Sequence, residues 1–319
     1  MIREQPAQRV GAIRPDPSDL SPLRIDEKLV RRMLVAFLRD ETAKVGLRRA
    51  VIGLSGGVDS AAVAALAAEA FGPERVLALH TPYRTSSERS LADARAVADR
   101  FGLRLEVVPI TAQIDAYFSQ GAPPLIPRDE PRGMPQRGPS TPGEASRPVT
   151  VDRVRMGNKM ARERKSIEFD RAWPDGAVIG TSNKTELLLG YGTWFGDMAS
   201  SLNPVGDLYK TQLRELAIEI GVPERIVAKP PTAELWPGQT DEGELGFTYA
   251  KADLILYHMV DRRLRPDELV AAGFDRELVE RIREMVRRSH YKRVMPLIAK
   301  VSLRTVGHDF LYPRDWESD

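Results

Sequence analysis

The sequence contains no cysteine among its 319 residues. That absence excludes disulfides, zinc–thiolate sites and every mechanism that needs a cysteine nucleophile or a persulfide carrier. Only four histidines are present, and they are scattered along the chain, so no His-rich metal site is indicated. No Ser-His-Asp hydrolase signature is found either. The chemistry of this chain must therefore depend on other side chains.

The chain also lacks a strong net charge and any long apolar run. Lys and Arg number 47 against 45 Asp and Glu, which leaves a net charge of +2. A balance so close to zero gives no reason to expect nucleic acid as a partner. No run approaches the roughly 20 apolar residues that a membrane span needs. The N-terminus lacks the apolar core of a secretory signal, so a cytoplasmic protein without a membrane partner is expected.

The most informative stretch that is present is residues 55–60, Ser-Gly-Gly-Val-Asp-Ser. It lies between the apolar run 51–54 and the Ala-rich run 61–70, a context of strand, tight turn and helix. Two adjacent glycines allow close approach of a ligand, and the start of a helix offers free N–H groups to an anion. Asp59 adds a carboxylate beside the expected phosphate, a combination that makes sense if Mg²⁺ bridges the two. The plain alternative is an ordinary turn in which Asp59 only favours the start of its helix.

Apolar patterning along the rest of the chain predicts an α/β fold. Helices are expected at 25–44, from 61 to about 70, at 86–101 and around 159–169, and strands at 51–54, 76–80, 103–110 and 177–180. Alternation at this spacing indicates a doubly wound, mostly parallel sheet, followed by a mainly helical C-terminal part. Ligands of such sheets bind beyond the carboxyl ends of the strands.

Proline and glycine mark the expected domain organisation. Residues 1–22 contain four prolines and are expected to form an irregular arm, followed by a single domain over 23–319. Within that domain, residues 120–150 are rich in Pro and Gly and keep neither a helical nor a strand period. Such an insert is usually a lid or a disordered segment, and both can hold if it orders over substrate.

The hexapeptide 55–60 resembles the pyrophosphate loop of the ATP pyrophosphatases, which adenylate an oxygen atom, release pyrophosphate and let a nucleophile displace AMP. The loop alone does not choose among the members of that family. Five further segments, in order, resemble NAD synthetase over roughly residues 25–300: 157–162, 180–186, 196–197, 210–214 and 229–247. The chain has the length of the short, ammonia-dependent branch, which carries no glutaminase domain.

This resemblance implies a fold, a reaction and partners. The fold would be that of the adenine nucleotide alpha hydrolase-like proteins. The reaction would be the ATP-dependent amidation of deamido-NAD by ammonia, through an adenylated intermediate, to give NAD, AMP and pyrophosphate. Such a carbon–nitrogen ligase would use Mg²⁺ and form a homodimer. Its ammonia would come free from solution or from a separate glutaminase subunit.

The resemblance also implies site residues. Asp59 and Glu186 would be magnesium ligands, and Asp59 and Lys210 would be catalytic, since a lysine charge neutralises leaving pyrophosphate. ATP would contact the loop and three later positions: Gly53, Leu54, Ser55, Gly56, Gly57, Val58, Asp59, Ser60, Thr181, Lys210 and Thr232. Deamido-NAD would contact Arg162, Ser201, Tyr291 and Lys292. On pattern alone, Glu186 could be an exposed acid at a helix start and Lys210 a solvated lysine.

Three positions depart from the family pattern. Tyr291 stands where many members have histidine, Ser201 where several have an acidic residue, and Trp194 where a lysine is common. These departures concern contacts with the dinucleotide. They leave the adenylation chemistry unaffected.

Two other functions fit parts of the pattern. One is a different ATP pyrophosphatase, such as a tRNA-modifying lysidine synthetase, although the near-zero net charge and the lack of a basic appended domain argue against it. The other is a non-catalytic regulator that binds adenine nucleotides. Intact Asp59 and Glu186 argue against a regulator, because a protein that only binds nucleotide need not keep two magnesium carboxylates.

Overall fold

The computed structural model of the chain describes residues 15–119, 151–232 and 240–307. The insert at 120–150 and most of the arm at 1–22 lie outside these residues, so both remain predictions, as does the single domain over 23–319. Within the described ranges, none of the helices combines the length and apolar character needed to cross a bilayer.

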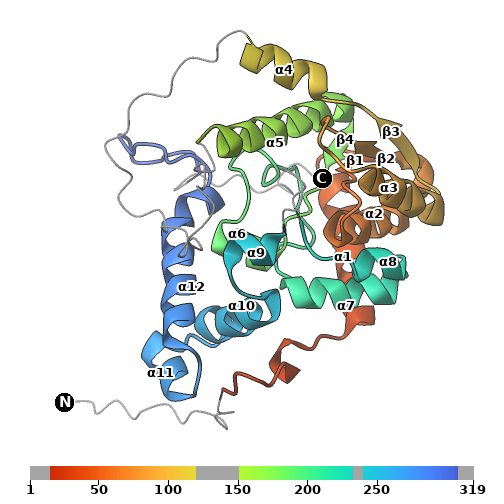
Figure 1. Cartoon of the computed structure of the whole chain (residues 1–319). Coiled ribbons are helices and arrows are strands. Elements are labelled where there is room, and N and C mark those ends of the chain that lie inside the picture. The colour runs from red at the N-terminus through yellow and green to blue at the C-terminus, as the bar shows by residue number, and fades with distance from the viewer. Residues whose placement is uncertain (1–14, 120–150, 233–239, 308–319) are drawn as a thin grey trace, which may run out of the picture.

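Four parallel strands form one sheet in the order β3-β2-β1-β4. In chain order the strands are β1 (Arg49–Gly53), β2 (Val76–His80), β3 (Arg104–Val107) and β4 (Gly176–Val178). Strand β1 is central, with Ile52 opposite Ala78 of β2 and Val51 opposite Val178 of β4. Figure 1 shows the sheet with helices against it.

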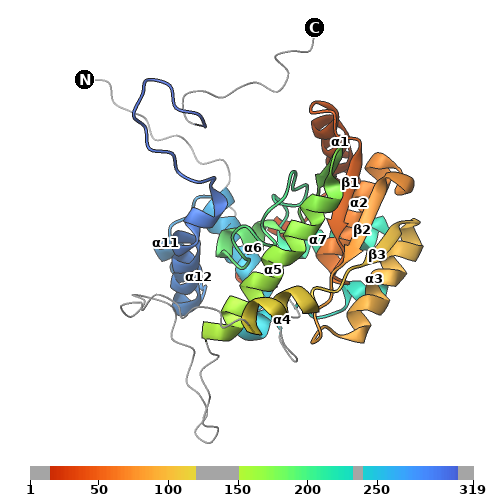
Figure 2. The same ribbon diagram turned by 90° about the horizontal axis from the view of Figure 1, so that it is seen from above.

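Helices cover both faces of the sheet (Figure 2). Successive residues of β1 point to opposite sides, so Ala50 and Ile52 join a core with α1, α2, α3 and α7, whereas Val51 joins a separate core with α5. Burial on both faces explains why β1 is apolar without interruption from Ala50 to Ile52. The helices concerned are α1 (Glu27–Ala43), α2 (Val58–Phe71), α3 (Glu88–Phe101), α5 (Val151–Ala172) and α7 (Lys210–Ile220).

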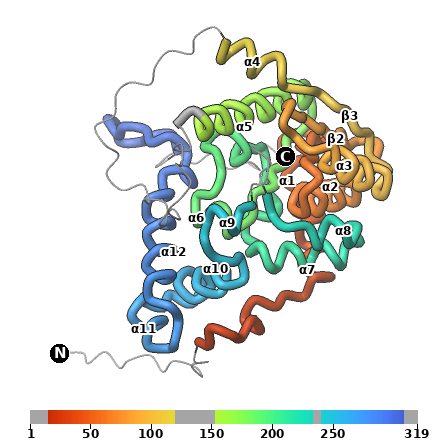
Figure 3. The backbone as a smooth tube through the Cα atoms, viewed as in Figure 1, coloured from red at the N-terminus to blue at the C-terminus, as the bar shows by residue number. Residues whose placement is uncertain are grey.

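A further apolar core, which includes Tyr209, Leu254 and Ile282, is built mainly by helices that follow β4 in the chain. Figures 1 and 3 place α11 and α12 on the opposite side of the molecule from β3. The other elements are α4 (Thr111–Ser119), α6 (Lys184–Leu189), α8 (Glu224–Val227), α9 (Asp241–Leu245), α10 (Tyr249–Leu256), α11 (Pro266–Ala271) and α12 (Arg276–Arg288). Short turns complete the fold: η1 (Ser21–Leu23), η2 (Pro73–Arg75), the π-helical η3 (Tyr257–Asp261) and η4 (His290–Arg293).

Two strands are shorter than the apolar pattern predicts. Strand β3 ends at Val107, whereas the pattern extends to residue 110. Pro109 has no N–H to donate to a ladder, while its neighbours Val108 and Ile110 donate to the carbonyls of His80, the last residue of β2, and of Pro82. Strand β4 ends at Val178, although the Ile179 N–H still donates to the Val51 carbonyl of β1, and Ile179 pairs with Leu202 in a parallel bridge. The sequence reading also missed helix α4.

The strand order positions the candidate site. The chain moves from β1 through β2 to β3 with α2 and α3 on one face, then returns to β4, beside β1, with α5 on the other face. The winding therefore reverses between β1 and β4. Loops after these two strands begin side by side at the carboxyl edge, which is where such sheets bind ligands.

Candidate active site

The loop between β1 and α2 has a fixed shape. Gly56 has φ +85°, and a Cβ there would lie 2.5 Å from the backbone oxygen of Ser90, so only glycine fits. The Ser60 hydroxyl accepts a hydrogen bond from the Ser55 N–H at 3.2 Å and donates to the Gly57 carbonyl at 3.1 Å. Helix α2 starts directly after Gly57. The backbone therefore turns where the sequence predicts phosphate binding.

Gly53 begins the loop next to a buried ion pair of α5. A Cβ at Gly53 would lie 2.3 Å from a carboxylate oxygen of Glu168. Glu168 accepts a hydrogen bond from the Lys165 ammonium at 2.6 Å, and both side chains are more than nine-tenths buried. The absence of a side chain at Gly53 therefore lets α5 pack against the end of β1.

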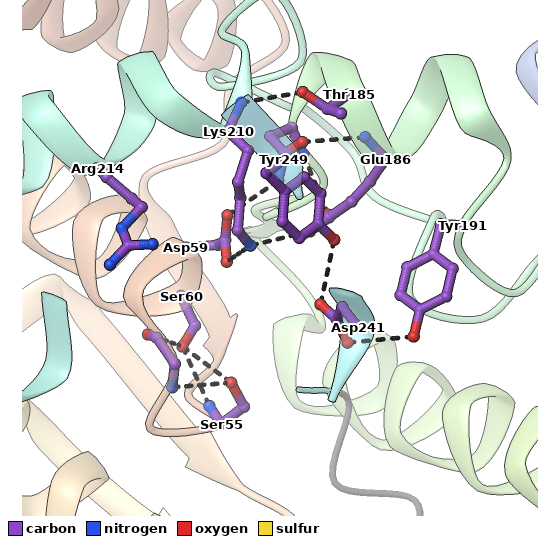
Figure 4. Close-up of polar contacts among 12 residues, drawn as sticks. Ser55, Asp59, Ser60, Thr185, Glu186, Tyr191, Lys210, Arg214, Asp241 and Tyr249 are labelled. Atoms are coloured by element: carbon purple, nitrogen blue, oxygen red, sulfur yellow. Dashed lines mark hydrogen bonds and ion pairs between the residues drawn. The ribbon is translucent and has the colours of Figure 1, made fainter. Parts of the chain in front are cut away.

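Three charged side chains from different elements converge beside the loop (Figure 4). The Lys210 ammonium, at the start of α7, lies 2.5 Å from Asp59 Oδ2 and 3.1 Å from Glu186 Oε1. Asp59 belongs to the first turn of α2 and Glu186 to the first turn of α6. The side chain of Lys210 is only 2% exposed, so it is not a solvated lysine.

Asn183 ties the two carboxylates together. Its side-chain amide donates to Asp59 Oδ1 at 3.0 Å, while its side-chain oxygen accepts from the Glu186 N–H at 3.0 Å. The Glu186 carboxylate in turn accepts the Asn183 N–H, which closes a capping box at the start of α6. Asn183 is fully buried. One cap residue therefore orients both predicted metal ligands.

Burial and charge shift the pKa values of this group. Burial raises the pKa of Glu186 to about 7, and the nearby Lys210 charge only partly opposes this. For Lys210, burial acts to lower the pKa, but the carboxylates of Asp59 and Glu186 outweigh it, so its pKa lies above the ordinary value. The site therefore holds a permanent cation next to a carboxyl that titrates near neutral pH.

The Glu186 shift predicts how metal-free protein responds to pH. A carboxyl whose folded-state pKa is raised stabilises the fold fully below its unfolded pKa, here 4.5, and that stability is lost as pH rises through about 7. Glu186→Gln removes this titration. The quantity to compare is the free energy of unfolding of wild type minus that of Glu186→Gln. This difference should fall by on the order of 3 kcal/mol between pH 4.5 and about pH 7, because one pKa unit corresponds to 1.36 kcal/mol. Urea unfolding at pH 5 and pH 8 in chelator measures it, and equal pH dependence in both proteins would contradict the shift.

A second cluster lies around the loop that follows α6. The Arg162 guanidinium of α5 donates to the backbone oxygen of Trp194 at 3.2 Å. The Trp194 ring stacks on Phe195 at 4.4 Å between centroids and meets the edge of Tyr291 at 5.4 Å. The Lys292 ammonium donates to two backbone oxygens of the loop, of Gly190 and Gly192, each at 2.8 Å. Three of the four residues predicted to hold deamido-NAD therefore surround one loop.

Comparison with known proteins gives a consistent result. A family model described as NAD synthase matches residues 30–296. The NH(3)-dependent NAD(+) synthetase of Trichlorobacter lovleyi is 54% identical over 298 residues, covering 93% of this chain and 99% of that protein. The chain belongs to the NAD synthase family. The family resemblance predicted from the sequence is therefore confirmed.

Two solved structures that are similar to this chain share the fold. The NMN synthetase of Francisella tularensis matches with a TM-score of 0.69 and 29% identity, covering 86% of this chain and 99% of that one. The NH3-dependent NAD synthetase of Campylobacter jejuni, solved with nitrate, matches with a TM-score of 0.66 and 29% identity, covering 86% and 100%. These neighbours and the observed strand order confirm the predicted doubly wound parallel sheet.

Ser201, the fourth residue predicted to contact deamido-NAD, is bonded to the end of strand β4. Its hydroxyl accepts a hydrogen bond from the Val178 N–H at 3.1 Å, and its own N–H donates to the Val178 carbonyl at 2.8 Å. In this arrangement Ser201 extends the edge of the sheet beyond β4. The hydroxyl accepts this bond and keeps its own O–H as a donor group, so its contact with deamido-NAD stays a prediction.

Two residues remain among those predicted to contact ATP: Thr181, which follows β4 in the chain, and Thr232, which follows α8. Thr181 comes directly after Gly180, whose N–H donates to the Leu202 carbonyl at 2.7 Å, so it lies at the carboxyl edge beyond β4. Thr232 follows Pro231, whose carbonyl accepts the Asp241 N–H at 3.0 Å. That bond brings the segment of Thr232 next to the start of α9.

Sequence reasoning missed several polar residues of this site. Asp241 accepts hydrogen bonds from the hydroxyls of Tyr191 and Tyr249, each at 3.1 Å, and the Lys210 ammonium lies 5.2 Å from the Tyr249 ring centre (Figure 4). Asn183 was also missed, although Asn followed three residues later by Glu is a capping-box signature that could have revealed it. Asp241 lies within the segment 229–247 that carried the resemblance, but nothing local marks its partners.

Proposed function

We propose that this chain forms NAD from deamido-NAD and ammonia while ATP is cleaved to AMP and pyrophosphate. The observation that carries the proposal is the Lys210 ammonium held between Asp59 and Glu186 beside a phosphate-type loop. Relatives across the family, including the 54% identical one, are named for NH(3)-dependent NAD(+) synthesis. The geometry and the relatives support the same reaction.

The site residues divide the adenylation step among them. Backbone N–H groups of the loop and the start of α2 would bind the ATP phosphates. The nicotinate carboxylate would attack the α-phosphorus, and the bond to pyrophosphate would break. Lys210, already charged, would neutralise the oxygen of the leaving pyrophosphate without any proton transfer. Ammonia would then attack the activated carbonyl carbon and lose a proton, and AMP would leave. Alignment and charge supply most of the rate, since no acid–base pair is found among the described site residues.

Mg²⁺ is the proposed metal, held by Asp59 and Glu186. Both carboxylates lie within hydrogen-bonding distance of the same Lys210 nitrogen, so one small cation could reach both. The part of the chain that the structure describes contains no group of three or more His, Cys, Asp or Glu side chains arranged for a metal. Phosphate oxygens and water would supply the remaining ligands, which Mg²⁺ commonly takes alongside one or two carboxylates. When bound, the ion would stabilise charge on the phosphates.

The dinucleotide is proposed to lie against the loop around Trp194, with Arg162, Tyr291 and Lys292 on its border. Tyr291 is half exposed and Arg162 is exposed, so both could reach a ligand. Burial lowers the pKa of Lys292, with Asp197 opposing this. Its ammonium already bonds two carbonyls of the loop, so its proposed task is to hold the loop in shape as well as to contact substrate.

We also propose a homodimer in the cytoplasm, where ATP is available. Helix α1 exposes Leu29, Met33 and Phe37, spaced four residues apart on one side, with Met33 60% exposed. An apolar stripe of this kind suits a second copy of the chain. Light scattering on a sizing column should give about twice the chain mass of 35.5 kDa, and Met33→Glu should shift the protein toward the single-chain mass. A wild-type protein that elutes as a single chain would contradict the dimer.

One assay separates this function from its rivals. Purified chain, ATP, Mg²⁺ and ammonium should release pyrophosphate only when deamido-NAD is added, with NAD formed in equal amount. Nicotinic acid mononucleotide is the matched comparison, because the structural neighbour from Francisella tularensis is named an NMN synthetase. Faster turnover of the mononucleotide would reassign the substrate. No pyrophosphate release with either nucleotide would favour a tRNA-modifying enzyme or a non-catalytic nucleotide binder.

A further inference from the structure

Asp253 is a buried carboxylate. Its hydrogen-bonding partners, Thr185 and Thr211, are not among the residues predicted to contact a ligand. It lies on α10, is fully buried, and occupies the place where the starts of α6 and α7 meet. Its Oδ1 accepts the Thr185 hydroxyl at 2.6 Å, and its Oδ2 accepts both the N–H and the hydroxyl of Thr211 at 2.8 Å. A buried charge is tolerated only when it is bonded in this way.

The groups that Asp253 holds are direct neighbours of the reactive residues. Thr185 precedes Glu186, and Thr211 follows Lys210. The Thr185 hydroxyl also accepts the backbone N–H of Lys210 at 3.0 Å. A single chain of bonds therefore runs from Asp253 through Thr185 to the backbone of Lys210, and a second runs through Thr211. Together they fix the relative position of two helix starts that are distant in sequence.

A second carboxylate repeats the arrangement at the end of the same segment. Asp261, in η3, accepts the Lys184 ammonium at 2.8 Å and the Tyr209 hydroxyl at 2.5 Å. Here too one partner comes from the start of α6 and the other from the residue before Lys210. Asp261 is about one-third exposed, whereas Asp253 is fully buried. The segment from α10 to η3 is thus hydrogen-bonded to the starts of α6 and α7 at two points.

These hydrogen bonds to the two helix starts matter because Lys210 has a long side chain. Its ammonium can meet two carboxylates at fixed distances only if its backbone is fixed, and small displacements of a charge-stabilising group are costly in rate. Burial raises the pKa of Asp253 to about 6, although its hydrogen bonds oppose this. The carboxylate is therefore ionised at neutral pH and can accept all three bonds there.

We propose that Asp253 is a positioning residue for the adenylation step. Through Thr185 and Thr211, Asp253 aligns Lys210 with Glu186. This inference rests on the proposed function for its kinetic readout. Its structural basis, the set of buried bonds to both helix starts, is independent of which carboxyl substrate is used.

The first test compares variants of nearly equal shape. Asp253→Asn keeps the side-chain shape but loses at least one acceptor, and Thr185→Val removes the bridging hydroxyl. Each should lower kcat about 10- to 100-fold, the usual effect of removing a residue that orients ligands of a metal site. Thr185→Ser keeps the hydroxyl and should restore kcat to within about threefold of wild type. Thr42→Val, which removes another buried helix hydroxyl, in α1, should leave kcat unchanged.

The second test asks whether Asp253 acts through Lys210. Asp253→Asn should lower kcat much less in a Lys210→Ala background than in wild type, because interacting residues are not additive. A general loss of structure would instead give equal losses in both backgrounds. Thermal unfolding of every variant shows that each is folded at the assay temperature, and Thr185→Val with Thr185→Ser decides the matter if Asp253→Asn does not fold.

A third readout needs no turnover. Binding of Mg²⁺–ATP, measured by calorimetry without deamido-NAD, should weaken about tenfold in Asp253→Asn and Thr185→Val but not in Thr42→Val. If wild type binds Mg²⁺–ATP but makes no NAD, the proposed function fails while this comparison still tests the positioning role. Additive losses in the Lys210→Ala background, or equal effects of Thr185→Val and Thr185→Ser, would overturn the inference.

Discussion

Asp59→Asn and Glu186→Gln should each lower turnover about a thousand-fold or more while the protein stays folded. A metal ligand lost beside the leaving pyrophosphate removes several kcal/mol of transition-state stabilisation, and each 1.36 kcal/mol is a factor of ten in rate. Both variants also disturb Lys210, since they neutralise one of the two carboxylates that it contacts. Steady-state rates of NAD formation at saturating ATP, measured across a magnesium titration, give the effect.

The control for this experiment lies on the same helix as Asp59. Glu69 near the end of α2 forms an exposed ion pair with Arg31 at 2.7 Å, so Glu69→Gln removes a charge without touching the site. Exposed pairs of this kind contribute about 0–1 kcal/mol to stability, and activity should remain at the wild-type level. Turnover of either site variant within tenfold of wild type at saturating Mg²⁺ would count against the metal assignment.

The second large effect concerns the nitrogen donor. The purified 319-residue chain should form NAD with ammonium and show essentially no rate with glutamine. Glutamine's amide nitrogen is too weak a nucleophile unless it is first hydrolysed, and the glutaminase domains fused to members of this family use a nucleophilic cysteine. This chain has no cysteine. Because NH₃ attacks and NH₄⁺ does not, the ammonium concentration needed for half-maximal rate should fall as the pH approaches the pKa of ammonium.

Ammonia-free glutamine makes this measurement decisive. A rate with glutamine that equals the ammonium rate, after contaminating ammonia has been removed, would overturn the ammonia-dependent assignment. Addition of an unrelated glutaminase should restore the rate and serves as the positive control. Glutamine-dependent activity that appears only with cell extract would identify a separate subunit as the source of ammonia.

Local sequence was sufficient for the strand and the helix on either side of the loop. The apolar run before Ser55 and the Ala-rich run after Ser60 predicted a strand, a turn and a helix, and β1 and α2 flank the loop accordingly. The pattern worked because burial of β1 on both faces leaves an uninterrupted apolar signal. It failed at the end of β3, where Pro109 removes a backbone donor without changing the apolar pattern.

Motif order singled out the charged residues but could not show how they contact one another. The family resemblance predicted Asp59, Glu186 and Lys210 as site residues, and the fold brings them into one group. It also predicted Ser201 as a dinucleotide contact, which stays a prediction, and the fold adds that its hydroxyl accepts a hydrogen bond from the Val178 N–H.

What the sequence by itself determined, then, is the loop, the alternation of strands and helices and the family. The tertiary structure decided which distant residues meet: Asp59 and Lys210 are 151 residues apart in the chain, and Thr185 and Asp253 are 68 apart. Asp59 and Lys210 meet because the winding reverses between β1 and β4. Thr185 and Asp253 meet because α10 packs against α6 and α7. A hydrogen bond across such a distance leaves no local periodicity or spacing, since each partner obeys only the pattern of its own helix.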